Sequence, residues 1–288
     1  MTFDKSQTLL LGHSPDPDDA FMFYAMAEGL IDLRGYRFEH ILQDIQTLNE
    51  RAARGELHIS AVSIHALAGL LDKYALLPSG ASMGDGYGPM FVAREPVSAA
   101  DDAAARDWLA GRVIAVPGLM TSAYLAAKLF LGPSFAHIVV PFDEIFDAVK
   151  SGRADAGLVI HEGQLTYKNE GFHLVADLGE WWTRTRGLPL PLGGNVVRRD
   201  LPANVKADIR DILKESIAFG LSRRADAVHH SMAHARGLDT ALADKFIGMY
   251  VNDLTLDYGE RGRRAVRTFL GESAAAGFVP PVPEIEFV

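Results

Sequence analysis

The stretch Gly157-Leu158-Val159-Ile160-His161-Glu162 is a short apolar run that ends abruptly in a histidine and a glutamate. Such a run is typical of a buried strand, and the end of a strand in an open α/β sheet is where ligands bind. An imidazole exchanges protons near neutral pH, so His161 is a candidate general base. The alternative is an inert histidine that closes the strand with a hydrogen bond to the backbone.

Similar apolar runs alternate with helical periodicity through the first two-thirds of the chain. The expected strands span residues 8–11, 36–42, 57–62, 90–93, 113–116, 137–140 and 156–160. Helices are expected at 18–29, 47–54, 64–71, 121–130 and 143–151. Residues 80–88 hold four glycines without periodicity and are expected to form a loop. This alternation predicts mainly parallel sheets that are covered by helices on both faces.

The pattern changes after Pro189-Leu190-Pro191-Leu192-Gly193-Gly194, and residues 204–276 are almost entirely helical in character. We therefore predict an α/β fold of two lobes with a central cleft and a helical carboxyl-terminal segment. Lobe I comprises residues 1–93 and 196–288, with the helical tail packed on it, and lobe II comprises residues 94–195. A cleft between two lobes is a preferred site for small ligands.

Composition excludes several classes of function. The chain has 288 residues and a formal net charge of −9, which argues against nucleic acid or an anionic membrane as the main partner. It has no cysteine, so disulfides, thiolate nucleophiles, iron–sulfur clusters and cysteine-ligated zinc are excluded. The amino terminus carries Asp4 and no apolar run long enough for a signal peptide or a membrane span, so a cytoplasmic location is expected. The sequence does not reveal the oligomeric state.

The acidic turn Ser14-Pro15-Asp16-Pro17-Asp18-Asp19 follows the first expected strand. Several carboxylates close together suit a divalent cation. The spacing matches no known metal loop, however, and we favour a rigid turn whose aspartates cap the next helix. His230 and His234 lie one helical turn apart without a third metal ligand, which favours a solvated helix face.

Hydroxyl groups follow two of the expected strands. Ser60-Ala61-Val62-Ser63 ends one strand, and Thr121 and Ser122 begin the helix after another. Free N–H groups at a helix start favour an anion or a polar oxygen, although simple capping explains Thr121 equally well. Trp181-Trp182 with Arg184 and Arg186 is either a stacking and cationic wall for an aromatic carboxylate or, as we favour, interface packing.

Taken together, these segments resemble the 1,4-dihydroxy-6-naphthoate synthases, which serve menaquinone biosynthesis by the futalosine route. The shared pattern extends from about Leu9 to the carboxyl terminus and includes Ser14-Pro15-x-Pro17-x-Asp19-x-Phe21, Asp44-x-x-Thr47-Leu48-Asn49, Ser63, Gly88-Pro89, Thr121-Ser122-Ala123-Tyr124, Gly157-Leu158-x-Ile160-His161-Glu162, Asp177-Leu178-Gly179-x-Trp181-Trp182, Gly187-Leu188-Pro189-Leu190-Pro191-Leu192-Gly193, Tyr250-Val251-Asn252, Leu256-Asp257 and Gly259. The order of so many pieces makes the resemblance specific.

The resemblance implies a type II periplasmic-binding-protein-like fold with the active site in the cleft. It implies a lyase that converts cyclic dehypoxanthine futalosine to 1,4-dihydroxy-6-naphthoate without a metal or organic cofactor. The family's proton acceptor matches His161. Its substrate-contacting segments match Ser60, Ala61, Val62 and Ser63 with Thr121 and Ser122, and the shared pattern adds Asp19 and Asn49 as further candidates.

The chain departs from the family pattern at several of these positions. Asp16, Asp18 and Ala20 stand where cysteine, asparagine and threonine are usual, and Ala61 stands where one member has a lysine. If that lysine pairs with the substrate carboxylate, Arg184 or Arg186 is the candidate replacement here.

Two rival functions share the expected architecture, because a fold does not determine an activity. One is the solute-binding protein of a transporter, and the other is chorismate dehydratase of the same pathway. The His161-Glu162 strand end and the segment Leu188-Pro189-Leu190-Pro191-Leu192-Gly193 favour the naphthoate synthase.

Overall fold

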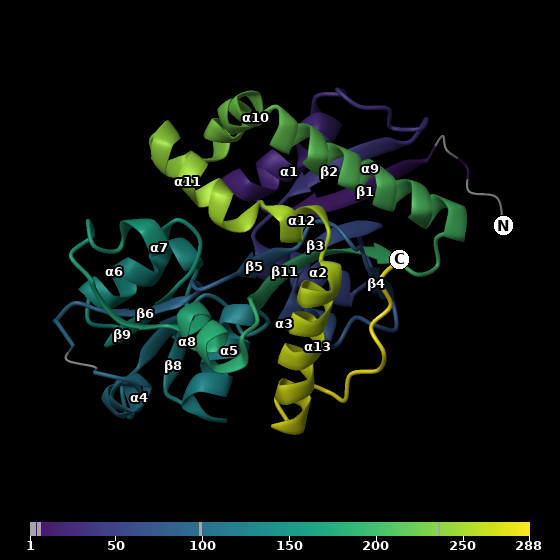
Figure 1. Cartoon of the computed structure of the whole chain (residues 1–288). Helices are drawn as coiled ribbons and strands as arrows, with labels where there is room; N and C mark the ends of the chain where they lie inside the picture. The colour runs from purple at the N-terminus through teal and green to yellow at the C-terminus, as the bar shows by residue number, and fades with distance from the viewer. Residues whose placement is uncertain (1–3, 5–6, 98–99, 236) are drawn as a thin grey trace.

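A computed structural model describes residues 4, 7–97, 100–235 and 237–288 (Figure 1). It contains two β-sheets, each with helices against it, and a helical carboxyl-terminal part. The expectation about a leader segment falls largely on residues 1–6, of which only Asp4 is described. None of the helices in these described ranges combines the length and the apolar character needed to cross a bilayer.

The first sheet is built around three parallel strands, with one strand pairing on both sides. Its path is β2 (Arg37–Leu42), β1 (Thr8–His13), β3 (Ile59–Ser63), β11 (Leu190–Arg198) and β4 (Tyr74–Leu76), and β5 (Ser82–Gly84) also pairs with β11. Strand β1 pairs in parallel with β2 and β3, whereas β11 is antiparallel to β3, β4 and β5. Apolar side chains of this sheet, such as those of Leu9 and Leu11, are buried in the core.

The second sheet repeats this plan. Its path is β8 (His137–Val139), β7 (Ile114–Val116), β9 (Ala156–Val159), β6 (Met90–Ala93) and β10 (His173–Asp177). Strand β7 pairs in parallel with β8 and β9, and β6 is antiparallel to β9 and β10. The fourth strand of each path, β11 in the first sheet and β6 in the second, is antiparallel to its neighbours. Each is also the first strand that the chain forms after it crosses from the other sheet.

These pairings move the lobe boundaries relative to those expected at residues 93/94 and 195/196. Strand β6 belongs to the second sheet, so the first crossing lies between β5 and β6. Strand β11 belongs wholly to the first sheet, so the return crossing lies between the end of α8 (Leu178–Arg186) and Leu190. Both differences have one cause: the strand after each crossing completes the sheet that it enters.

The helices divide between the two lobes and the tail. Those associated with the first sheet and its connections are α1 (Pro17–Ala27), α2 (Ile45–Ala53) and α3 (Ile64–Leu67). Those of the second lobe are α4 (Asp102–Leu109), α5 (Ser122–Leu131), η1 (Phe142–Glu144), α6 (Ile145–Lys150), α7 (Gly163–Thr166) and α8. The tail holds α9 (Ala203–Ser222), α10 (Arg224–Ser231), η2 (Met232–His234), α11 (Thr240–Tyr250), α12 (Asp253–Leu256) and α13 (Gly259–Ala275).

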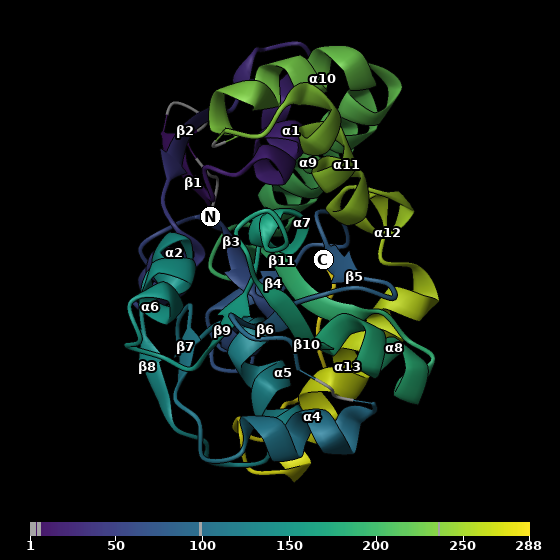
Figure 2. The ribbon, with the colours of Figure 1, turned by 90° about the vertical axis from the view of Figure 1, so that its left-hand side faces the viewer.

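The tail packs mainly on the first lobe. Helices α9, α10 and α11 gather over α1 at one end of the molecule, and α4 lies at the other end (Figure 2). The Ser216 hydroxyl of α9 donates to the Met22 carbonyl at 2.7 Å, and Phe21 lies against Gly220. The tail therefore buries the apolar face of α1 and fixes the helix that follows β1.

The expected strands and helices are all present with shifted ends, and the structure adds elements where none was expected, notably between residues 173 and 198. There the structure forms β10, α8 and β11, and β5 lies within the expected loop 80–88. Pro191, Gly193 and Gly194 are strand-breaking residue types. The sheet accommodates them because the register of β11 shifts between Pro191 and Gly193, where a bulge removes the regular pairing.

The first crossing is held against α8 by two glycines. A Cβ on Gly179 would overlap the Tyr87 carbonyl, and a Cβ on Gly88 would lie 2.9 Å from the Gly179 Cα. Backbone in contact with backbone leaves no room for adjustment, so both positions require glycine.

We expect Gly179→Ala to destabilise the chain by about 1–3 kcal/mol or more, because overpacking forces backbone to move. Thermal unfolding should show Tm lowered by about 2–4 °C for each kcal/mol. The matched control is Gly271→Ala on α13, where the added methyl meets nothing within 4 Å. That control should be neutral or stabilising by about 0.5–1 kcal/mol. An unchanged Tm for Gly179→Ala would contradict the contact.

Candidate active site

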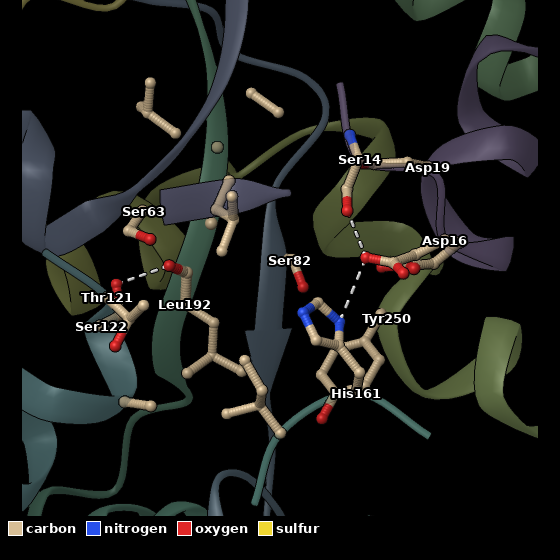
Figure 3. Close-up of a pocket in the computed structure, with 18 of the residues that line it drawn as sticks. Ser14, Asp16, Asp19, Ser63, Ser82, Thr121, Ser122, His161, Leu192 and Tyr250 are labelled. Atoms are coloured by element: carbon tan, nitrogen blue, oxygen red, sulfur yellow. Dashed lines mark hydrogen bonds and ion pairs between the residues drawn. The ribbon is translucent and has the colours of Figure 1, made fainter. Parts of the chain in front are cut away.

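A pocket that is continuous with solvent lies between the two lobes. Its lining comes largely from the carboxyl end of β3 and from segments that follow β1, β7 and β9, where the carboxyl ends of parallel strands of both sheets meet. Tail residues Phe246 and Tyr250 and strand residues 192–195 complete it. Figure 3 shows Ser63, Thr121 and Ser122 on one side and Ser14, Asp16 and His161 on the other.

The acidic turn after β1 forms one wall of this pocket. Ser14, Asp16, Asp18 and Asp19 are all buried and all line the pocket. The Ser14 amide donates to Asp19 Oδ2 at 2.7 Å, and the Ser14 hydroxyl donates to Asp16 Oδ2. These bonds hold the turn in one shape. Asp16 occupies the N-cap position of α1, but its side chain makes no capping hydrogen bond.

His161 follows β9 and enters the pocket from the other lobe. Its Nδ1 lies 3.3 Å from Asp16 Oδ2, and the Phe142 ring packs edge-on against the imidazole at a centroid distance of 4.7 Å. The backbone of His161 has φ = +54°, a left-handed conformation that only a few non-glycine residues adopt. Such strain, of order 1–3 kcal/mol, persists where the surroundings fix it and is concentrated at functional sites.

The neighbouring aspartates hold protons more tightly than ordinary carboxyl groups. Burial, together with the charge of Asp16, raises the pKa of Asp18 from 3.8 to about 6. Burial and the charge of Asp18 likewise raise the pKa of Asp19 well above its usual range. The Oδ1 atom of Asp18 is buried without a hydrogen-bond partner. The wall therefore does not carry three full negative charges at mildly acidic pH.

The opposite wall offers neutral hydrogen-bonding groups at the start of α5. Thr121 caps α5 by accepting from the Tyr124 amide at 3.2 Å, and the Ser122 hydroxyl donates to the Leu192 carbonyl at 2.6 Å. The first amides of a helix have no partner within it, so the amides that start α5 can meet an oxygen of a ligand.

Ser63 belongs to this same wall and is fixed by Asn49. The Asn49 side chain accepts from the Ser63 amide at 2.8 Å and donates to its hydroxyl at 3.0 Å. Asn49 itself is fully buried and does not line the pocket. Its place is behind the wall, where it orients Ser63.

Side chains from the two lobes also meet across the pocket. The Tyr250 hydroxyl of α11 donates to Gln164 Oε1 of α7 at 2.6 Å, and both residues are buried and line the pocket. Burial raises the pKa of Tyr250 well above its ordinary value, so this hydroxyl stays protonated. Together with the approach of Asp16 to His161, this bond links the lobes around the cavity.

The described chain matches a family model for menaquinone biosynthesis over residues 9–275. The chain belongs to this menaquinone biosynthesis family. A 1,4-dihydroxy-6-naphthoate synthase of Streptomyces coelicolor is 40% identical over 280 residues, which cover 96% of each chain. An enzyme of the same name from Thermus thermophilus is 38% identical and covers 98% of this chain and 100% of its own length.

Solved structures with a similar fold were also found. A crystal structure of a protein from Archaeoglobus fulgidus is 43% identical, with a TM-score of 0.88 over 94% of this chain and 98% of that one. The alkanesulfonate-binding protein of Xanthomonas axonopodis is 15% identical, with a TM-score of 0.68 over 95% and 94% of the two chains. The second likeness concerns fold alone, and it confirms the two-lobed periplasmic-binding-protein-like architecture.

The structure brings together most of the site residues that the sequence suggested. The pocket is lined by Asp19, Ala61, Val62, Ser63, Thr121, Ser122 and His161. Ser60 is fully buried, and its hydroxyl donates to the Ala61 carbonyl at 2.8 Å, so it lies behind the lining rather than in it. Contact of Ser60 with a substrate stays a prediction.

Arg184 and Arg186 lie outside the pocket of this family member. Arg184 pairs with Asp102 at 2.6 Å and with Glu180, whereas Arg186 pairs with Glu272 at 2.8 Å and stacks over Trp181 and Trp182. Both tryptophans are buried in the core, which confirms the packing interpretation. Among the described residues that line the pocket, none is a lysine or an arginine.

The sequence interpretation missed the role of the acidic turn. Capping was the favoured explanation for its aspartates, yet Asp16 faces His161 instead. The available signal was the departure from the family pattern at Asp16 and Asp18.

Within the described part of the chain, no group of three or more histidine, aspartate or glutamate side chains is arranged to hold a metal ion. His230 instead packs against Tyr24 and pairs with Glu28.

We expect Asp18→Asn to stabilise the chain at pH 7.5 and to lose that advantage in acid. The folded chain binds the Asp18 proton more tightly than the unfolded chain, so its contribution to stability is lost as pH rises from about 3.8 through about 6. Tm of the variant should exceed that of the parent at pH 7.5, by about 2–4 °C for each kcal/mol. Below pH 4 the two should converge.

The control for that comparison is Asp226→Asn, which changes an exposed acid in the first turn of α10. It should show no gain that depends on pH in the same way. A Tm difference between Asp18→Asn and the parent that stays constant from pH 4 to 7.5 would contradict the raised pKa.

We expect Arg184→Ala and Arg186→Ala to leave the substrate KM within about threefold of the parent, because neither cation reaches the pocket. Steady-state kinetics on folded variants measures this. A large rise of KM in either variant would return that arginine to the substrate site.

Proposed function

We propose that the chain is a lyase that converts cyclic dehypoxanthine futalosine to 1,4-dihydroxy-6-naphthoate in menaquinone biosynthesis, with His161 as the general base. The names of the two curated relatives support the reaction. The observation that carries the chemistry is the position of His161, which follows β9, lines the interlobe pocket and faces a buried carboxylate. A cytoplasmic location stays a prediction from the sequence.

Release of an aromatic product by carbon–carbon cleavage requires removal of a proton near a carbonyl group. A base whose ordinary pKa is close to the operating pH is efficient in that step, and histidine has that property. The Tyr250–Gln164 hydrogen bond joins the two lobes beside the imidazole-lined pocket. Closed walls exclude water and hold the substrate against the base.

The substrate carboxylate is assigned to the wall at the start of α5. Because the described lining contains no lysine or arginine, neutral donors must supply recognition. The amides at the start of α5 and the hydroxyl of Ser63 are such donors, and the helix dipole favours negative charge there. The acidic wall around Asp16 repels an anion, so it sets the orientation of the substrate.

We expect His161→Gln to lower kcat by about 10²–10⁴-fold with little change in KM, because glutamine fills the site without accepting the proton. Ultraviolet absorbance of the naphthoate product follows turnover. His230→Gln is the matched control, since His230 lies on α10 outside the pocket and should retain parental rates.

Activity of His161→Gln close to that of the parent would remove His161 from the mechanism. Incubation of the parent with chorismate tests the sister activity, and turnover of chorismate alone would replace the proposed reaction. Tight binding of the substrate with no product would indicate a solute-binding protein.

A further inference from the structure

The unusual conformation of Asp16 carries a second inference. An aspartate at the N-cap of a helix ordinarily accepts a hydrogen bond from the second or third helical amide. Asp16 has the extended backbone of an N-cap residue, with φ of −113° and ψ of 156°, but its side chain does not cap α1. The carboxylate turns instead toward the pocket, where Oδ2 meets the Ser14 hydroxyl and the His161 imidazole.

We propose that Asp16 is a positioning residue for His161: its carboxylate accepts the Nδ1–H of the imidazole and leaves Nε2 unprotonated and directed into the pocket. This inference rests on the proposed function, because it gives His161 the tautomer that a general base at Nε2 requires. In Figure 3 the second ring nitrogen of His161 points away from Asp16, toward the side of the pocket that holds Ser63 and Ser122.

The separation of 3.3 Å between Nδ1 and Oδ2 is long for a charge-assisted hydrogen bond. Hydrogen bonds of this kind are often long in an unliganded site and tighten when the substrate is bound. Because Asp16 belongs to the first lobe and His161 to the second, closer approach of the lobes shortens the contact. The imidazole is therefore aligned most firmly when the cleft is most closed.

Two features of the surroundings support this assignment. Asp16 is 1% exposed, and a carboxylate buried to that degree requires partners. The left-handed backbone of His161 requires something to hold it, and the ring lies between Asp16 on one side and Phe142 on another. A histidine whose second nitrogen bonds a carboxylate is fixed in both tautomer and orientation.

The first test measures whether Asp16 acts through His161. We expect Asp16→Asn to lower kcat at least about thirtyfold with KM within about threefold of the parent. In a His161→Gln background the same change should lower the residual rate by less than about threefold, because the partner is already absent. Ser14→Ala, which removes only the anchor of the carboxylate, should give an intermediate loss.

Equal losses from Asp16→Asn in both backgrounds would overturn the proposal, since they would show an independent role. A rise of KM without a fall of kcat would also overturn it. If Asp16→Asn fails to fold, Ser14→Ala and its double variant with His161→Gln provide the same cycle.

The second test requires no turnover and separates this proposal from the proposed reaction. Nitrogen NMR of the full chain labelled with ¹⁵N-histidine, with His161 assigned by its loss in His161→Gln, reports which ring nitrogen carries the proton. At pH 8 we expect protonated Nδ1 in the parent and a shift toward protonated Nε2 in Asp16→Asn. Protonated Nε2 in the parent, or no change in the variant, would overturn the pairing even if the enzyme is active.

Discussion

The antiparallel strand that enters each sheet after a lobe crossing is the constraint on which the rest of the structure depends. Strand β11 completes the first sheet and β6 completes the second, so the chain passes twice between the lobes. The two crossings hold the sheets so that the end of β3 and the segments after β1, β7 and β9 line one pocket. The His161 imidazole from the second lobe and the Asp16 carboxylate from the first then meet there, although they are 145 residues apart in the sequence.

The two walls of the pocket differ in electrostatic character, and in the proposed function that difference orients the substrate. Asp16, Asp18 and Asp19 are buried together, and the raised pKa values of the latter two reduce the charge that the cluster carries in mild acid. The wall at the start of α5 presents amides and hydroxyls with the positive end of a helix dipole.

Much of the fold and part of the site follow from sequence patterns. The runs that become β1, β3, β7 and β9 are apolar and short, and their ends carry the residues that line the pocket, so His161, Ser63 and Thr121 can be found without coordinates. Strand β11 cannot be predicted in this way, because Pro191, Gly193 and Gly194 are strand-breaking residues. Only a bulge in the assembled sheet accommodates them. Likewise, Asp16 has the sequence context of a helix cap, but its carboxylate meets the Ser14 hydroxyl of the same turn and the His161 imidazole of the second lobe instead. Arg184 and Arg186 show the opposite case. Their sequence context suggests a binding site for a carboxylate, but both form ion pairs with acidic side chains outside the pocket.

The most direct measurement of the central claim is a crystal structure of the chain with 1,4-dihydroxy-6-naphthoate bound. The account expects the product between the lobes, with its carboxylate at the start of α5 and its hydroxylated ring within hydrogen-bond reach of His161 Nε2. A product molecule held outside this pocket, or inside it with the hydroxylated ring turned away from His161, would contradict the account.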